Sequence, residues 1–254
     1  MRFSKWHALG NAYLVVEQPD AGALDAARVG RLCDQETGIG SDGVLEVVRH
    51  DTTSAEIVIW NPDGSIAEMS GNGVRIAGRW LAERTGAETV EIVTAGRTAR
   101  IRMLGGVLAE TDIGRVDIGA EEVVDAGEPI TVTTASVGNP HAVVRLDDAT
   151  RDDLLRLGPR LERHPRFPQR TNVQLADPQG PHDLRVLVWE RGAGETSSSG
   201  SSSVAAAAVA VSHGWCESPV TVHLPGGALS VSFEGDRALL TGPALEVARG
   251  ETDI

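Results

Sequence analysis

The strongest constraint on this chain is an internal duplication, whose two copies are offset by about half of the chain length. Residues 57–81 and 184–211 each run from an apolar, β-branched segment ending in Trp, through a polar loop, to a Ser-Gly step that opens a second apolar segment. In both copies the Trp lies 10 residues before the Ser, and Ser70 and Ser199 are 129 residues apart. Apolar β-branched runs are typical of buried strands, and a recurring period indicates a repeated structural unit. The sequence therefore predicts two copies of one strand–loop–helix unit.

A second repeated pair supports the duplication. The dipeptides Gly10-Asn11 and Gly138-Asn139 are 128 residues apart, and each lies beside an apolar run. In a chain of 254 residues, the repeat predicts two lobes of about 120 residues rather than one large domain. Strand and helix patterns recur in both copies and predict the α/β class, with the second copy opening near Val116.

Composition excludes several classes of function. The net charge is −13 and no basic patch stands out, which argues against binding to nucleic acid. No apolar run approaches the roughly 20 residues of a membrane span, and the first residues lack the apolar core of a signal peptide. Two cysteines, Cys33 and Cys216, cannot form a disulfide framework, so a cytoplasmic protein is expected. The histidines are scattered, so no metal site is expected.

Local patterns predict several further elements. Apolar spacing predicts helices over Ala23–Cys33 and Asp152–Glu162, and strands over Phe3–Trp6 and Tyr13–Glu17. The run Ser197–Ser203 has the composition of a linker, but it lies between a strand and an Ala-rich segment. We therefore predict that it forms a helix N-terminus, where serine is a favoured capping residue.

The two Ser-Gly steps are candidate anion sites. A helix N-terminus presents unpaired backbone amides and positive dipole charge, so two of them facing each other would hold a small anion. Gly71, Asn72, Gly200 and Ser201 directly follow the two serines. Neither the GxxxxGK[ST] phosphate loop nor the dinucleotide fingerprint is present, so a carboxylate is expected rather than a nucleotide.

Polar side chains near these segments would suit an amino-acid ligand: Asn11, Asn61, Asn139, Asn172, Glu190 and Arg191. Arg binds a carboxylate through two hydrogen bonds, and Glu and Asn oxygens accept from an ammonium group. Structural interpretations stay open beside this one. Asn61 and Asn139 each precede a proline, and the dipeptide Asn-Pro is common at the start of a turn. Glu190 and Arg191 could form a surface ion pair, and His141 could be a hydrogen-bonded loop histidine. Cys33 is expected in the core.

Seven segments resemble, in order and over nearly the whole chain, those of the diaminopimelate epimerase family. They are FSKWHALGNAYLVVE, TGIGSDGVL, WNPDGSIAEMSGNGVRIAGRW, SVGNPHAVV, RTNVQLAD, WERGAGETSSSGSSSVAAAAVA and LLTGPALEVARG. The resemblance implies two pseudo-symmetric α/β lobes, each a mixed sheet wrapped on a central helix, with the active site in the cleft between them. It implies lobes over residues 1–115 and 116–240, with the C-terminal strand 241–254 returning to the first lobe.

The resemblance also implies a reaction and its residues. The expected activity is the interconversion of LL-2,6-diaminopimelate and its meso form, for lysine and cell-wall synthesis, and a homodimer is left open. Catalytic roles fall on Ser70, Ser199, His141 and Glu190. Substrate-binding roles fall on Asn11, Asn61, Gly71, Asn72, Asn139, Asn172, Glu190, Arg191, Gly200 and Ser201. No cofactor is expected, and Lys5, the one lysine of the chain, lies in no motif for a Schiff base.

One departure from the family bears on the chemistry. The family uses two cysteines, one on each face of the α-carbon, and serines occupy both positions here, Ser70 and Ser199. A thiol has a pKa of about 8.5 that a helix N-terminus lowers, whereas a serine hydroxyl needs an adjacent base. Ala12 also replaces a usual acidic residue. Three interpretations stay open: engineered replacement of both cysteines, a natural relative with altered chemistry such as a dehydratase, and amino-acid binding without catalysis.

Overall fold

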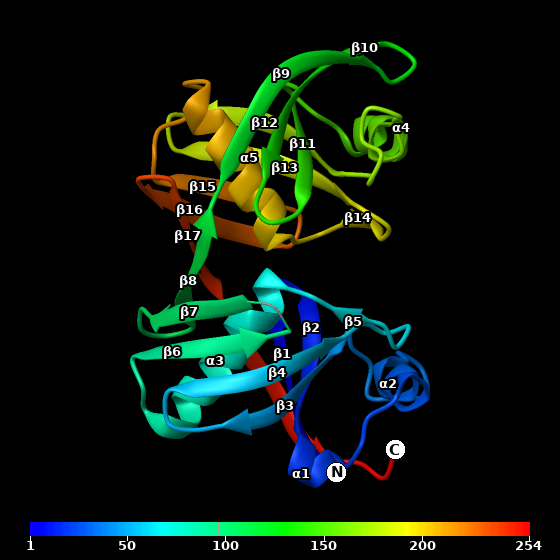
Figure 1. Ribbon diagram of the computed structural model, residues 1–254, viewed down its shortest axis with the longest axis vertical. Helices are drawn as coiled ribbons and strands as arrows, with labels where there is room; N and C mark the ends of the chain where they lie inside the picture. Colours follow the sequence, from blue (N-terminus) through cyan, green and yellow to red (C-terminus); the bar gives the residue numbers. More distant parts are fainter. Residues whose placement is uncertain (96) are drawn as a thin grey trace. The chain divides into compact units, whose positions relative to one another are not determined.

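The duplication in the sequence reappears as two units of the same architecture. The computed structural model describes residues 1–95 and 97–254. Unit 1 comprises Met1–Asp112 together with Gly242–Ile254, and unit 2 comprises Ile113–Thr241. Each unit is a curved mixed sheet with one long helix packed against it, which confirms the predicted α/β class (Figure 1). Within these residues, no helix is both long enough and apolar enough to cross a membrane.

The elements of the first copy come in chain order. They are β1 (Arg2–Ala8), β2 (Asn11–Glu17), α1 (Gln18–Ala21), α2 (Ala26–Cys33), β3 (Val44–His50), β4 (Ser54–Trp60), β5 (Ile66–Ala67), α3 (Gly71–Thr85), β6 (Thr89–Thr94), β7 (Arg97–Met103), β8 (Leu108–Arg115) and, at the C-terminus, β18 (Leu245–Glu251).

The second copy repeats this succession. Its elements are β9 (Asp117–Asp125), β10 (Pro129–Ser136), β11 (Pro140–Arg145), α4 (Arg151–Glu162), β12 (Asn172–Gly180), β13 (Asp183–Glu190), β14 (Gly194–Thr196), α5 (Gly200–Ser212), β15 (Val220–Leu224), β16 (Gly227–Glu234) and β17 (Arg237–Pro243).

Strand pairing follows one scheme in both units. In unit 1 the order is β18–β1–β2–β3–β4–β6–β7–β8, and the parallel pairs are β2–β3 and β4–β6. In unit 2 the order is β9–β10–β11–β12–β13–β15–β16–β17, and the parallel pairs are β11–β12 and β13–β15. Parallel neighbours need a crossover connection, which the helices provide at the same two places in each unit.

The register of the strands repeats with the same offset as the sequence. Val44 lies opposite Trp60 across β3 and β4, and Val173 lies opposite Trp189 across β12 and β13. Both pairs are related by 129 positions. Because a slip of one residue would turn every side chain of a strand to the other face, this match is specific. It confirms the predicted duplication residue by residue.

The long helices α3 and α5 form the centre of their units. The side chains of α3 are buried from Asn72 to Ala82, and α5 is buried at Gly200 and from Ser202 to Ala210. A helix that is apolar on all sides is a core helix, and the small side chains of α5 let strands β10, β11, β12, β13, β15 and β16 pack around it. Ser199 is the N-cap of α5. The serine-rich run is therefore a helix start, as predicted, and not a linker.

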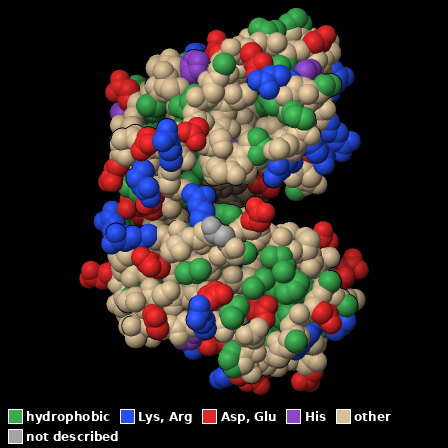
Figure 2. Space-filling model, in the orientation of Figure 1, with side chains coloured by type: hydrophobic (Ala, Val, Ile, Leu, Met, Phe, Trp, Pro, Cys, Tyr) green, Lys and Arg blue, Asp and Glu red, His purple; other side chains and the backbone are tan. Residues whose placement is uncertain are grey.

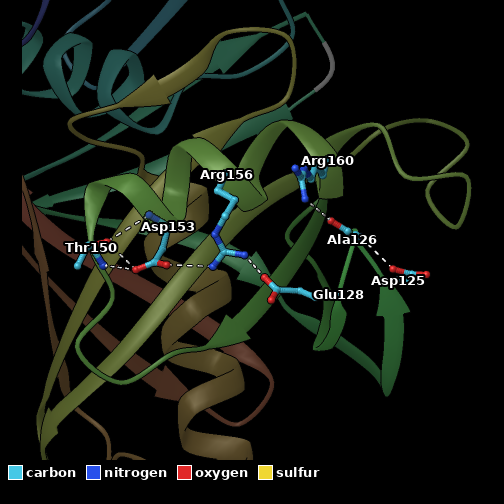
Figure 3. Close-up of polar contacts among 8 residues, drawn as sticks. Asp125, Ala126, Glu128, Thr150, Asp153, Arg156 and Arg160 are labelled. Atoms are coloured by element: carbon cyan, nitrogen blue, oxygen red, sulfur yellow. Dashed lines mark hydrogen bonds and ion pairs between the residues drawn. The ribbon is translucent and has the colours of Figure 1, made fainter.

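Capping residues decide where the two crossover helices α2 and α4 begin. In α4, Thr150 and Asp153 form a capping box, which Figure 3 shows at the left end of the helix. The helix accordingly starts one residue before the predicted Asp152. In α2, the Asp25 side chain accepts from the Arg28 N–H at 2.8 Å. This cap starts the helix at Ala26, three residues later than the apolar spacing predicts.

Charged side chains of both signs lie on the surface of the protein. Figure 2 shows acidic and basic side chains interspersed over the face that it presents. Several of the basic groups are paired, as Arg156 is with Glu128 and Asp153 on the outside of α4 (Figure 3).

The close approach of α4 to Trp189 gives a first prediction. A Cβ atom added at Gly158 would lie 2.7 Å from Trp189 Cγ, whereas one added at Gly30 of α2 would meet its nearest atom, the Pro62 carbonyl oxygen, at 3.6 Å. We expect Gly158→Ala to lower the free energy of unfolding by about 1–3 kcal/mol through overpacking. The matched variant Gly30→Ala should leave it unchanged or raise it by up to about 1 kcal/mol. Urea unfolding measures both, and equal effects would contradict the packing described.

Candidate functional site

Ser70 is the N-cap of α3 and has a structural role. Its backbone is extended, and its Oγ accepts a hydrogen bond from the Gly73 N–H at 3.0 Å. The hydroxyl of Tyr13 donates to the same Oγ at 3.1 Å. Serine is among the best N-cap residues because it satisfies an otherwise unpaired helix amide. The Ser70 hydroxyl thus has two hydrogen-bond partners within unit 1.

Ser199 occupies the equivalent position in unit 2 but has a different environment. Its backbone is extended in the same way, yet its side chain makes no capping hydrogen bond. Burial raises the pKa of the half-buried Glu190 carboxyl above its usual value, and an interaction with the Ser199 side chain partly offsets that increase.

His141 lies on β11 at the centre of a buried hydrogen-bond chain. Its Nε2 lies 2.9 Å from Asn139 Oδ1, and its Nδ1 lies 3.0 Å from the side-chain nitrogen of Gln174. That nitrogen also donates to Ser202 Oγ at 3.0 Å. Both ring nitrogens of His141 therefore have a hydrogen-bond partner within unit 2.

The protonation state of His141 follows from this burial. Its side chain is 1% exposed. Burial lowers the pKa of the imidazole to about 3, and the positive charge of Arg191 lowers it further, while the hydrogen bond with Gln174 opposes the shift. The ring is therefore neutral at pH 7 with both nitrogens engaged.

Asn172 joins the end of β13 to β11. Its side-chain nitrogen donates to the Pro140 carbonyl at 2.9 Å, and its Oδ1 accepts from the Arg191 backbone N–H at 3.0 Å. The Arg191 guanidinium is exposed and donates to the Gln169 carbonyl at 3.3 Å. The surface ion pair of Arg191 with Glu190, left open by the sequence, is thus not the arrangement found. Asn172 instead fixes the backbone from which both side chains project.

The asparagines of unit 1 divide into two groups. Asn61 follows β4 and binds Ser65 through both backbone and side chain, which supports its interpretation as a turn residue. Asn11 begins β2 and Asn72 begins α3, and their carboxamides bind each other at 3.2 Å. Asn11 and Asn72 thus lie together beside Ser70, near the backbone amides of Gly71 and Gly73.

Sequence reasoning missed the residues that support these side chains. Tyr13, Asp42, Arg75, Gln174 and Ser202 all contact a candidate site residue. A signal was present, because Arg75 and Gln174 are polar residues within runs that are otherwise buried and apolar. Buried polar groups need partners, so such residues indicate a hydrogen-bond network. Of the residues that the structure describes, no three His, Cys, Asp or Glu side chains lie together in a way that could hold a metal ion.

Comparison with known proteins gives consistent matches over the whole chain. The sequence matches the family model for diaminopimelate epimerase over residues 3–129 and 133–247. It is 35% identical over 282 aligned positions to a diaminopimelate epimerase of Stutzerimonas stutzeri, covering 100% of this chain and 99% of the relative. Identity and coverage are the same for a diaminopimelate epimerase of Pseudomonas fluorescens. A solved structure of a predicted epimerase from Pseudomonas aeruginosa has a TM-score of 0.77 at 19% identity, covering 100% of this chain and 99% of that one.

The neutral, buried state of His141 predicts a pH dependence of stability. The pKa of the imidazole is about 3 in the folded protein and about 6.5 when unfolded, so the unfolded state binds more protons between these values. The contribution is fully present above pH 6.5 and is lost as the pH falls toward 3. Between pH 7 and 5 we expect it to lower the free energy of unfolding by about 1–2 kcal/mol.

Matched histidine variants isolate this effect. In His141→Gln the added loss of stability between pH 7 and 5 should disappear, because the buried group no longer titrates. In the control His182→Gln, at an exposed histidine of the same unit, the loss should match that of the parent. Urea unfolding at a series of pH values measures the difference, and parallel curves for all three proteins would show that His141 titrates alike in the folded and unfolded states.

Proposed function

Because this chain belongs to the diaminopimelate epimerase family, we propose that it binds LL-2,6-diaminopimelate and interconverts it with the meso form. The reaction removes the proton from one α-carbon and returns a proton to the opposite face, without a cofactor. The observation that carries the proposal is the repeated Ser-Gly helix start, at Ser70 and Ser199, in a chain whose sequence matches the family throughout.

The helix starts would hold the substrate carboxylate next to the reacting carbon. The backbone amides of Gly71, Asn72, Gly200 and Ser201 are in the first turns of α3 and α5, where N–H groups lack helical partners. Their dipoles favour a negative charge. Loss of the α-proton moves further negative charge toward the carboxylate, so the same amides would stabilise the carbanion-like transition state.

The far end of the substrate would be held by unit 2. Asn139 and Asn172 offer carboxamides whose orientation is fixed by His141 and by the Arg191 backbone. The exposed Arg191 guanidinium is available to bind the second carboxylate in a bidentate manner. His141 is proposed to act through Asn139, because its own nitrogens are both engaged.

The two serines are proposed to differ in chemical competence. Ser199 is proposed to act together with Glu190, whose carboxyl pKa the Ser199 side chain lowers against the effect of burial. Ser70 is proposed to serve chiefly as a helix cap, since its oxygen is bonded to the Gly73 amide and to the Tyr13 hydroxyl. Inversion needs an acid and a base on opposite faces of the α-carbon. With serine at both positions, we expect this chain to bind substrate well and to invert it slowly.

The capping role of Ser70 favours a second candidate function, amino-acid binding without catalysis. An altered reaction such as dehydration, which needs a base on one face only, is compatible with Glu190 beside Ser199. We propose that the activity is cytoplasmic, as expected of an enzyme that supplies lysine and cell-wall precursors. The tests below separate binding from proton transfer.

Binding of the distal carboxylate depends on Arg191 in this proposal. We expect calorimetry to show tighter binding of diaminopimelate than of lysine or glutamate, each of which lacks one of its end groups. Arg191→Ala should weaken the binding of diaminopimelate by about 2–4 kcal/mol, since a charged contact is lost. The control Arg156→Ala, an exposed arginine of unit 2 bound to Glu128 and Asp153, should leave affinity unchanged. Equal affinity for all three ligands would count against the distal contact.

Restoring the thiols tests the proton-transfer step. In heavy water, proton NMR should show that the parent chain exchanges the α-proton of diaminopimelate very slowly. Ser70→Cys and Ser199→Cys together should restore deuterium incorporation and epimerisation, because a thiol at a helix N-terminus ionises near neutral pH. Each single variant should give much less net inversion. Rapid epimerisation by the parent would show that another base serves, and an inactive double variant that still binds substrate would establish the binding-only function.

A further inference from the structure

We propose that Arg75 and Asp42 are positioning residues that fix the orientation of the Asn72 and Asn11 carboxamides. The inference rests on the proposed function insofar as these two asparagines bind substrate. Neither Arg75 nor Asp42 belongs to the set of site residues that the family resemblance implies. The four side chains all lie in unit 1 and form one continuous chain of hydrogen bonds.

Three contacts make up this chain. Arg75 Nη2 donates to Asn72 Oδ1 at 2.9 Å, and Asn72 Nδ2 donates to Asn11 Oδ1 at 3.2 Å. Asn11 Nδ2 then donates to Asp42 Oδ2 at 3.3 Å. Both ends are tied to the backbone, since Arg75 Nε donates to the Pro243 carbonyl at 3.1 Å and Asp42 Oδ2 accepts from the Ala12 N–H at 2.8 Å.

The chemistry of the two ends sets the direction of the whole chain. A guanidinium has only N–H donors, so the carboxamide atom of Asn72 that meets Arg75 must be the oxygen. The nitrogen of Asn72 then faces Asn11, which must offer its own oxygen. The nitrogen of Asn11 is left facing Asp42, and a carboxylate can only accept. An inverted carboxamide at either asparagine would place two donors or two acceptors against each other.

Burial makes the arginine end of the chain the stronger constraint. Arg75 is fully buried, and its Nη1 has no hydrogen-bond partner among the described residues. Burial lowers the pKa of its guanidinium to about 10, so the group is still charged at neutral pH. A hydrogen bond from a charged donor is about twice as strong as one between neutral groups. Asp42 is exposed, so its contact with Asn11 is weaker.

Orientation matters because a carboxamide can present either a donor or an acceptor to a ligand. Asn72 directly follows Gly71 in the first turn of α3, the place proposed for the substrate carboxylate. A carboxylate needs N–H donors, and an inverted carboxamide would direct its oxygen at the anion. Arg75 would therefore act on affinity through Asn72 and Asn11, without touching the substrate itself.

Calorimetry with diaminopimelate on the full chain tests the effect on binding. Arg75→Met removes the donor while keeping a buried side chain of similar length, and it should weaken binding at least tenfold. Arg75→Lys keeps a donor-only cation and should recover most of the affinity. Asp42→Asn can donate as well as accept, so it should weaken binding by a smaller factor, about threefold. Matched controls are Arg79→Met, at the next buried arginine of α3, and Asp51→Asn, an aspartate that caps a turn of unit 1. Neither control should change the affinity.

Side-chain amide NMR tests the chain independently of any ligand. With ¹⁵N labelling, the signals of Asn11 and Asn72 are assigned by their loss in Asn11→Ala and Asn72→Ala. Arg75→Met should shift the signals of Asn11 as well as Asn72, and Asp42→Asn should shift those of Asn72 as well as Asn11. Such reciprocal effects are expected of a coupled chain, whereas independent contacts would give local shifts only.

The outcomes separate this inference from the proposed function. If the parent chain binds no diaminopimelate but the amide shifts are reciprocal, the proposed function fails and the positioning role stands. If Arg75→Met only lowers the unfolding temperature, with unchanged affinity in the folded protein and local amide shifts, Arg75 is a structural residue and the inference is wrong. Asp42→Asn, at an exposed position, keeps the test decisive should Arg75→Met not fold.

Discussion

The structure depends on one constraint, the burial of a helix start inside a curved sheet. The sheet of each unit packs around α3 or α5, and the first turn of each helix lies within the buried part. Backbone N–H groups in that turn cannot pair within the helix, so something else must satisfy them. In a binding protein that partner can be the ligand. The anion site proposed in each unit would therefore be a consequence of how the fold packs.

The two copies meet this constraint in different ways. In unit 1, Ser70 caps the helix, and a chain from Arg75 to Asp42 holds the neighbouring carboxamides. In unit 2 the cap hydrogen bond is missing, and a chain from Ser202 through Gln174 to His141 holds Asn139. Duplication has preserved the backbone register but not the polar contacts. The strand order is set by burial of apolar faces, which both copies share, whereas each polar chain can be changed without altering the fold.

This difference explains what the sequence could predict. The class, the duplication and the helix start at the serine-rich run follow from periodic apolar residues and local capping, and all three were found. The start of α2 was misplaced because apolar spacing continues past the Asp25 cap. The partners of Asn72 and His141 could not be predicted, since Arg75 and Gln174 meet them only through tertiary packing. The change of Ser199 from a capping residue to a partner of Glu190 has no sequence signal either.

Helix capping gives a structural reason for a serine at one of the two equivalent positions, Ser70 and Ser199, but not at the other. Serine is a favoured N-cap, so Ser70 stabilises the start of α3, and its presence there has a structural explanation. That explanation does not extend to Ser199, because its side chain makes no capping hydrogen bond. Equivalent positions of the two units therefore carry the same residue in different local roles: Ser70 stabilises the start of its helix through its side chain, and Ser199 does not.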